Sequence, residues 1–349
     1  MRGGFRRNVT ISISFALALN TQVNALIDHR NSILHWAMQG RLAAGNVEQA
    51  MREAGELPDR SDWRGFIDRL LLWGGAVLFA VGVIFFFAYN WSEINRVARL
   101  GLAEMLLAVA VACCGWFGTE RPAGKVSLFT AALLTGALLA LFGQTYQTGA
   151  DTFELFITWA VVILPWTIVG RLPALWVLLI ALVNTAITFY FMVFHGLFGL
   201  LFSTEKELWL LFAVNTTALV LWELFSKSLV WLRERWAARL LGFASGSLIT
   251  ALAMFAIFDH KETFVLAAVI VYPLWLAAIY ACYRHVILDL FLLAGGVLSI
   301  VIVIASLLSE AMLHGRNEGG PLLLIGLVVI GLSALGGIWL KNLAREGLR

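Results

Sequence analysis

Apolar residues occur in long continuous runs, separated by short polar segments, along most of this 349-residue chain. A helix needs about 20 mostly apolar residues to cross the hydrocarbon core of a bilayer. Ten runs reach or approach that length: Leu70–Tyr89, Ala98–Phe117, Val126–Phe142, Phe153–Ile168, Leu172–Phe194, Leu208–Phe225, Ala237–Phe258, Phe264–Tyr283, Val286–Leu308 and Pro321–Leu340. Barrel strands would be shorter and would alternate apolar with polar residues. The pattern therefore predicts an all-α, polytopic transmembrane helical bundle of about ten spans.

Composition and charge agree with this prediction. Hydrophobic residues make up 60% of the chain and charged residues 13%, against about 45–50% and about 25% in soluble domains. The formal net charge of +3 is small, and no basic cluster alternates with aromatic residues, so the expected partner is the lipid bilayer and not nucleic acid.

The distribution of Lys and Arg predicts the orientation of the spans. If both termini are cytoplasmic, only five of the 25 basic residues fall outside: Arg96, Arg99, Lys206, Lys261 and Arg316. The other twenty lie on the cytoplasmic side, as the positive-inside rule requires. An even number of spans with cytoplasmic N- and C-termini is therefore self-consistent.

Three regions are expected: a leader over 1–25, a small cytoplasmic helical module over 26–68, and the transmembrane domain over 69–349. The leader has the layout of a signal peptide, with basic residues before an apolar stretch. Alternatively, it is a disordered or interfacial segment, or the start codon is placed too far upstream. Its charge pattern argues against export, because a cleaved signal would reverse the positive-inside bias.

The module is expected to hold three helices, the third of which leads into the first span. The first ends at Gly40 and has an apolar face of Leu26, Ile33, Trp36 and Met38. Asn46 and Gln49 resemble a capping box for the second helix, and Ser61 is placed to cap the third. The module is too small to be very stable alone, so we expect it to pack on the membrane domain or on a protein partner.

Two stretches resemble a known family. One includes Trp36–Leu42, Gly75–Gly82 and Phe87–Trp91; the other is Gly-Gln-Thr-Tyr-Gln-Thr-Gly-Ala-Asp at 143–151, followed by Leu155, Phe156, Trp159 and Leu164–Trp166. Together they resemble the DUF2157 family of bacterial predicted membrane proteins, a domain of unknown function, from about Leu26 to Phe194. The resemblance implies a bacterial inner-membrane protein and supplies no activity.

Polar residues at one predicted membrane face form the main candidate ligand site. Asn90, Trp91 and Glu93 follow the first span. Gln144, Tyr146, Gln147, Asp151 and Glu154 lie between the third and fourth spans, in a segment without Lys or Arg. This extracytoplasmic patch could bind a small polar ligand, a sugar-like group or a cation. The alternative is a set of helix caps and interfacial aromatic anchors.

Ionisable residues within spans are costly to bury and often functional. Glu104 is the strongest candidate for a proton relay or a cation site, because it lies on the same side as the polar patch. Glu223 and Asp289 are further candidates near span ends. The structural alternative pairs Glu104 with Arg99, and Asp289 with Arg284.

Other polar and small residues favour helix packing. Asn184, Thr185, Thr188, Asn215, Thr216 and Thr217 lie in the middle of the fifth and sixth spans and predict contacts between them. Gly242 and Gly246 form a small-xxx-small pair suited to close helix approach.

Cys113, Cys114 and Cys282 lack the spacing of a metal site or a redox motif, and no metal, cofactor or catalytic motif is present in the sequence.

Three hypotheses follow for function. The first is transport or permeation of a small solute or ion, based on the many spans, the buried carboxylates and the polar patch. The second is a non-enzymatic scaffold or sensor in envelope maintenance that binds a partner through the cytoplasmic module. The third is an enzyme acting on lipid-linked sugars, for which Asp151 and Glu154 are the only suitable pair.

Overall fold

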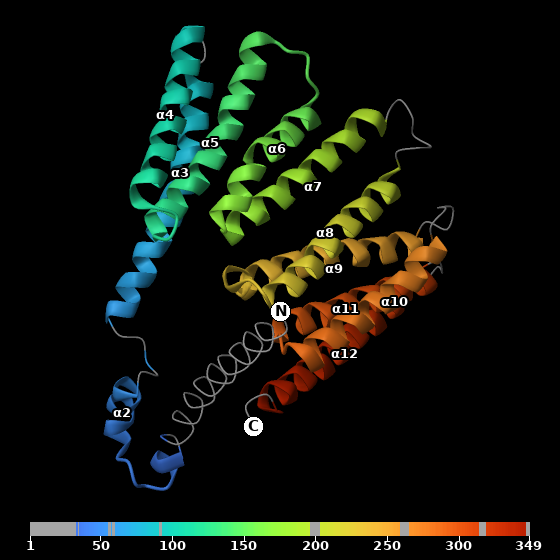
Figure 1. Cartoon of the computed structure of the whole chain (residues 1–349). Coiled ribbons are helices and arrows are strands. Elements are labelled where there is room, and N and C mark those ends of the chain that lie inside the picture. Colours follow the sequence, from blue (N-terminus) through green and yellow to red (C-terminus); the bar gives the residue numbers. More distant parts are fainter. Residues whose placement is uncertain are drawn as a thin grey trace, which may run out of the picture. The chain divides into compact units, whose positions relative to one another are not determined.

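The computed structural model describes residues 33, 35–54, 57, 60–90, 93–195, 203–258, 265–313 and 319–346. Every regular element within them is a helix, which confirms the all-α prediction (Figure 1). The chain forms two compact units, Met1–Gly75 and Ala76–Gly347. The predicted leader over 1–25 lies outside the described residues.

In the first unit, the helix that includes residues 35–38 ends at Gly40, as predicted. Gly40 has a positive φ of 69°, a conformation that glycine adopts without strain. The N–H of Arg41 donates to the Trp36 carbonyl at 3.0 Å, and the N–H of Gly40 donates to the Ala37 carbonyl at 3.1 Å. This pair of bonds satisfies the last carbonyls of the helix and closes it.

The second module helix starts after Asn46, as predicted, but neither Asn46 nor Ser61 caps a helix with its side chain. The 3-10 helix η1 (Ala44–Asn46) runs directly into α2 (Val47–Glu53), so Asn46 is already helical and its side chain makes no capping bond. Ser61 lies within the first turn of α3 (Arg60–Tyr89), which is 30 residues long. The third predicted module helix and the first predicted span are therefore one continuous helix.

Ten helices within the described residues are long and apolar enough to cross a membrane, as predicted. They are α3, α4 (Arg96–Phe117), α5 (Pro122–Tyr146), α6 (Thr152–Gly170), α7 (Pro173–His195), α8 (Thr204–Ser226), α9 (Arg235–Phe258), α10 (Val265–Ala281), α11 (Leu290–Leu313) and α12 (Gly319–Glu346). A short 3-10 helix, η2 (Val230–Leu232), joins α8 to α9.

Local signals in the short connections explain where several spans begin and end. The Asn95 side chain accepts the N–H of Ala98 at 2.8 Å and caps α4. Gly118, with φ of 76°, ends the same helix, and Pro122 occupies the first turn of α5. Ser203 accepts the N–H of Lys206 and caps α8. These residues are frequent at such helix positions because they satisfy free backbone groups or preset the backbone angles.

The ninth span starts later than predicted. Helix α10 continues into a π-helical turn, η3 (Cys282–Val286), and α11 begins only at Leu290. Asp289 consequently precedes α11 and does not lie one turn inside it. Its Oδ1 accepts the N–H of Phe291 at 3.1 Å, so this carboxylate caps α11.

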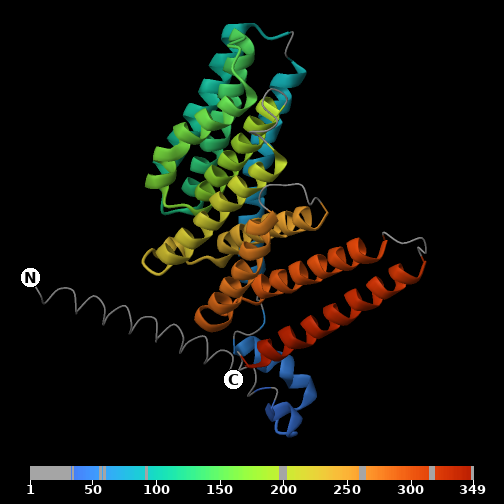
Figure 2. The same cartoon turned by 90° about the vertical axis from the view of Figure 1, so that its right-hand side faces the viewer.

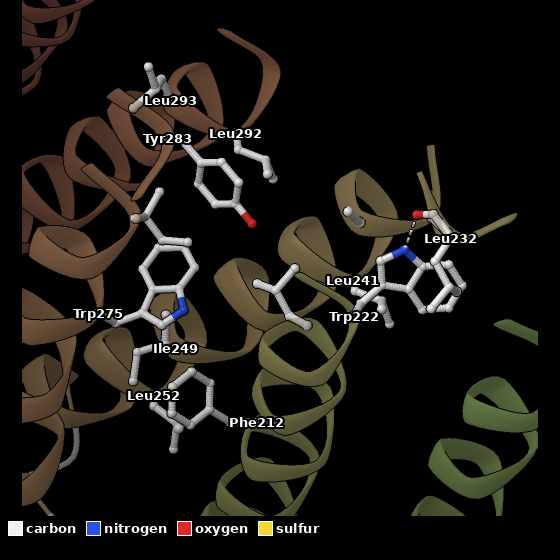
Figure 3. Close-up of a cluster of buried hydrophobic side chains, with 14 of the residues drawn as sticks. Phe212, Trp222, Leu232, Leu241, Ile249, Leu252, Trp275, Tyr283, Leu292 and Leu293 are labelled. Carbon is white, nitrogen blue, oxygen red and sulfur yellow. Dashed lines mark hydrogen bonds between the residues drawn. The ribbon is translucent and has the colours of Figure 1, made fainter. Parts of the chain in front are cut away.

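Two buried apolar clusters hold the second unit together. One joins α3, α4 and α5 through residues that include Val83, Phe87, Ala103 and Leu134. The other cluster contains residues from each of the helices α8 through α12. Figure 3 shows Trp275 and Tyr283 on one side of this cluster and Trp222 on the other. Helices α4 and α5, and likewise α11 and α12, lie side by side (Figures 1 and 2).

Consecutive spans run in opposite directions across a bilayer, so the helix ends divide between two membrane faces. The face at which the even-numbered helices α4, α6, α8, α10 and α12 end is called the even face. The odd face is the one at which α3, α5, α7, α9 and α11 end.

Candidate functional site

Four of the eight predicted site residues line one hollow on the odd face. Gln144, Gln147, Asp151 and Glu154 surround a cavity of about 510 Å³ where α5 ends and α6 begins. None of the described residues that line it is Lys or Arg. The hollow therefore offers amide and carboxylate groups, which suit a cation or a polar solute better than an anion.

The predicted loop around this hollow is shorter than expected. Helix α5 continues through Tyr146 and α6 starts at Thr152, so Gln144 and Glu154 are helical residues. Gln147 adopts a left-handed conformation, with φ of 47°, and its N–H bonds to the Gly143 carbonyl. This turn directs the chain across the hollow.

Of the other four predicted residues, the three that the structure describes do not line the hollow. Tyr146 is 57% exposed and packs its ring on Phe142, with centroids 4.6 Å apart. Asn90 donates from Nδ2 to the Phe86 carbonyl at 2.8 Å, at the end of α3. Glu104 is exposed on α4 and makes no hydrogen bond or ion pair with another residue in the described part of the chain. Trp91 lies outside the described residues.

A buried ionic cluster on the even face connects four consecutive helix ends. Arg235, at the start of α9, donates from Nη1 to both carboxylate oxygens of Glu223, at 2.9 and 3.0 Å. Its Nε donates to Oδ2 of Asp289 at 3.2 Å. Arg239, one turn further, donates from Nε to both Asp289 oxygens at 3.2 and 3.0 Å. We define this cluster as Glu223, Arg235, Arg239, Asp289 and Tyr283.

Burial in the cluster is graded from the acids to the bases. The Asp289 side chain is 1% exposed and that of Glu223 12%, whereas Arg235 is 27% and Arg239 46% exposed. Two carboxylates and two guanidinium groups give a formal charge of zero. Buried charges need such compensation, because removing an ion from water costs several kcal/mol.

The fifth member, Tyr283, comes from the irregular end of α10. Its hydroxyl donates to Oε1 of Glu223 at 2.9 Å, and the Arg235 guanidinium lies 5.7 Å from its ring centroid. Helix α10 also contains Pro273. A proline and a π-helical turn both disrupt regular backbone hydrogen bonding, and single π turns are frequent at functional sites.

The predicted pairing of Asp289 with Arg284 was wrong. Arg284 lies in the π-helical turn and donates to Glu346 of α12 at 2.6 Å. Sequence reasoning also missed Arg235, Arg239 and Tyr283. The sequence did carry a signal for one of these contacts. A base at the start of one span lies at the same membrane face as an acid at the end of the preceding span, and Arg235 and Glu223 are placed in this way.

A second hollow adjoins the cluster. It has a volume of about 320 Å³, lies between α8 and α10, and is lined by Glu223, Lys227, Cys282 and Tyr283 among other residues. Its deeper end reaches Thr216 and Trp275. This hollow lets a small molecule approach the cluster from between two helices.

Polar side chains bridge the helices in the middle of the spans. Asn184 of α7 and Asn215 of α8 exchange two amide hydrogen bonds of 3.1 and 2.8 Å, which confirms the predicted contact. Thr216 bonds to Ser245 of α9 at 2.7 Å, and Ser245 also accepts the indole N–H of Trp275 at 3.0 Å. These bonds fix the rotation of each helix against the next.

The predicted glycine pair lies at helix contacts, but these are with large side chains and not with a closely approaching backbone. A Cβ atom on Gly242 would lie 2.4 Å from a methyl carbon of Leu292, and one on Gly246 would lie 2.9 Å from the Trp275 ring. Both contacts are to side chains of α10 and α11, so the glycines admit large residues and not another backbone.

The comparisons with known proteins locate one family match. The family model DUF2157, described as a predicted membrane protein, matches residues 34–176. No curated protein and no solved structure matches the chain. Among the described residues, no group of His, Cys, Asp and Glu is arranged to hold a metal ion. Residues 34–176 of this multi-pass helical membrane protein are thus similar to the DUF2157 family, as the two motifs within them had indicated.

Proposed function

We propose that the chain transports a small cation, or a small cationic solute, across the bacterial inner membrane. The observation that carries this proposal is the buried, charge-neutral cluster that links the ends of α8 and α10 to the starts of α9 and α11. Buried ionisable groups in a membrane domain are expensive and frequently belong to ion pathways. The cluster acts as a gate: it closes the even face when its ion pairs are formed.

Two hollows, one at each face, support this proposal. The acidic hollow at the α5–α6 junction on the odd face would concentrate cations. On the even face, the hollow beside Glu223 gives access to the cluster. A cation that binds Glu223 competes with Arg235 for the carboxylate and so weakens the contact that joins α8 to α9.

The orientation follows from the basic residues. Those of the even face include Arg121, Arg171, Lys227 and Arg233, and the positive-inside rule places such residues in the cytoplasm. In this proposal the gate is cytoplasmic, the acidic hollow is extracytoplasmic, and both termini are cytoplasmic.

A separate observation favours an additional role in protein binding. In the first unit Trp36 and Met38, two residues apart, are 48% and 82% exposed. Exposed apolar side chains in a small polar module suit a protein partner, as a scaffold or sensor would need. Deletion of residues 26–60 should then release a partner that co-purifies with the full chain, without unfolding the membrane domain.

Reconstitution tests the transport proposal. The purified full chain in liposomes should conduct Na⁺, K⁺ or H⁺ down an imposed gradient faster than protein-free liposomes, measured with ion-sensitive dyes. Glu223→Gln should change that flux at least several-fold, because it removes one partner of Arg235. The matched control is Glu234→Gln on the same face, since Glu234 is exposed and accepts only the Trp236 indole among the described residues.

The proposal is overturned if none of the three ions moves faster than in protein-free liposomes. It is equally overturned if Glu223→Gln and Glu234→Gln have the same effect, because the cluster would then not lie on the pathway.

A further inference from the structure

An apolar hollow of the second unit lies between α9, α10 and α11. Its volume is about 470 Å³, within the range of about 300–1,000 Å³ typical of small-molecule sites. Its lining includes small residues: Gly242 and Gly246 from α9, and Ala294 and Gly295 from α11. Trp275 of α10 forms part of its wall.

The lining offers almost no free polar group to an occupant. Ser247 donates its hydroxyl to the Phe243 carbonyl at 2.8 Å. Thr250 donates to the Gly246 carbonyl at 2.6 Å and shares a 2.7 Å contact with Ser299. Because these hydroxyl groups already have partners within the protein, the hollow suits a hydrocarbon chain better than a polar solute.

The edges of this hollow face outward from the bundle. Phe243 of α9 is 57% exposed, and Phe291 and Leu298 of α11 are 51% and 57% exposed. In a membrane-spanning domain these apolar edges meet lipid, so a lipid chain can enter the hollow sideways.

A cationic group stands at one end of the hollow. Arg239 precedes Gly242 and Phe243 by three and four residues on α9, and such residues share a helix face. Its partner Asp289 is hydrogen-bonded to the N–H of Phe291, which lines the hollow. Arg239 therefore lies at the even-face end of the hollow, at the depth of lipid headgroups.

The two terminal nitrogens of Arg239 are available to a ligand. Only Nε binds Asp289, which fixes the direction of the guanidinium plane. None of the hydrogen bonds or ion pairs between described residues uses Nη1 or Nη2, and the side chain is 46% exposed. Two adjacent N–H-bearing nitrogens match the oxygens of a phosphate group in a bidentate fashion.

We propose that the hollow between α9, α10 and α11 binds an anionic phospholipid, with its phosphate on Arg239 and one acyl chain along Gly246, Gly295 and Leu298. Charge complementarity at the rim and the apolar lining select this occupant over a soluble anion or a zwitterionic lipid. The proposal concerns binding and does not depend on transport.

Native mass spectrometry of the detergent-purified full chain tests the site. Phosphatidylglycerol should bind more tightly than phosphatidylcholine with the same acyl chains. Arg239→Gln should weaken phosphatidylglycerol binding about fivefold, the effect of one basic residue near an anionic headgroup. Arg239→Lys should retain most of the affinity. The matched control is Arg233→Gln, an exposed base six residues away on the same face, which should change nothing.

A second pair of variants tests the acyl site. A Cβ atom on Gly295 meets no atom within 4 Å, so a side chain can begin there, and Gly295→Leu should occupy part of the hollow and reduce phosphatidylglycerol binding. Gly331→Leu on α12 has the same open surroundings but lies outside the hollow, and should bind like the wild type.

Three results would overturn the proposal. Equal losses for Arg239→Gln and Arg233→Gln would indicate only general electrostatic attraction. Unchanged binding to Gly295→Leu would show that the hollow holds no acyl chain. Competition by glycerol 3-phosphate at the same concentration as the lipid would show that a free phosphate group suffices.

Discussion

The Nε atom of Arg239 donates to both carboxylate oxygens of Asp289, at 3.2 and 3.0 Å, across 50 residues of sequence. The acid is almost fully buried, whereas the base is half exposed. Asp289 also accepts hydrogen bonds from Nε of Arg235 and from the backbone N–H of Phe291. One carboxylate thus fixes the start of α11 and holds two bases of α9.

Replacement of Asp289 should destabilise the second unit strongly. Asp289→Ala leaves two guanidinium groups without their shared acid and removes the cap of α11. Breaking a buried ion pair from one side costs about 3–5 kcal/mol. The free energy of unfolding in mixed detergent micelles measures this loss. Asp151→Ala is the control, because the exposed Asp151 side chain makes no capping bond; a similar loss in both variants would contradict the prediction.

The Asn184–Asn215 pair should couple α7 to α8 energetically. Each amide is both donor and acceptor in the pair, so either single change to Leu removes both bonds and leaves the other amide without its partner on the facing helix. A double-mutant cycle should give a coupling energy of about 0.6–1.7 kcal/mol. Thr185→Val serves as a comparison, since the Thr185 hydroxyl donates only to Ala181 within its own helix. Additive effects at positions 184 and 215 would refute the coupling.

Gly136 and Gly101 should respond oppositely to alanine. A Cβ atom on Gly136 would lie 2.4 Å from the ring of Trp159, whose indole donates to the Ala132 carbonyl at 2.8 Å. Gly136→Ala should therefore cost about 1–3 kcal/mol through overpacking. Gly101→Ala meets no atom within 4 Å and should gain up to about 1 kcal/mol from helix propensity. Thermal denaturation in detergent compares the two; a neutral Gly136→Ala would contradict the packing.

Cysteine accessibility should distinguish the two membrane faces. In a chain with its three native cysteines replaced by Ala, Asp151→Cys on the odd face should react with a membrane-impermeant maleimide in intact cells. Glu120→Cys on the even face should react only after the membrane is permeabilised. Both side chains are exposed, so reactivity reports the side of the membrane. The reverse result would invert the proposed orientation.

Several features of this protein could be predicted from the sequence because lipid imposes local rules. A continuous apolar run in a bilayer must be helical, so the ten spans follow from hydropathy alone. Mid-span amides such as Asn184 and Asn215 must bond across helices, since neither lipid nor their own helix satisfies them fully. The closing turn at Gly40 follows from the freedom of glycine to adopt positive φ.

The tertiary structure decided which side chains meet. Glu104 and Asp289 look alike in sequence, as acids near the start of a span, yet one faces outward from α4 and the other lies buried between two arginines. That difference depends on the rotation of each helix about its axis, which hydropathy does not fix. The π-helical turn adds a local change of register between α10 and α11: Arg284 within it bonds to Glu346, and Asp289 beyond it pairs with Arg235 and Arg239.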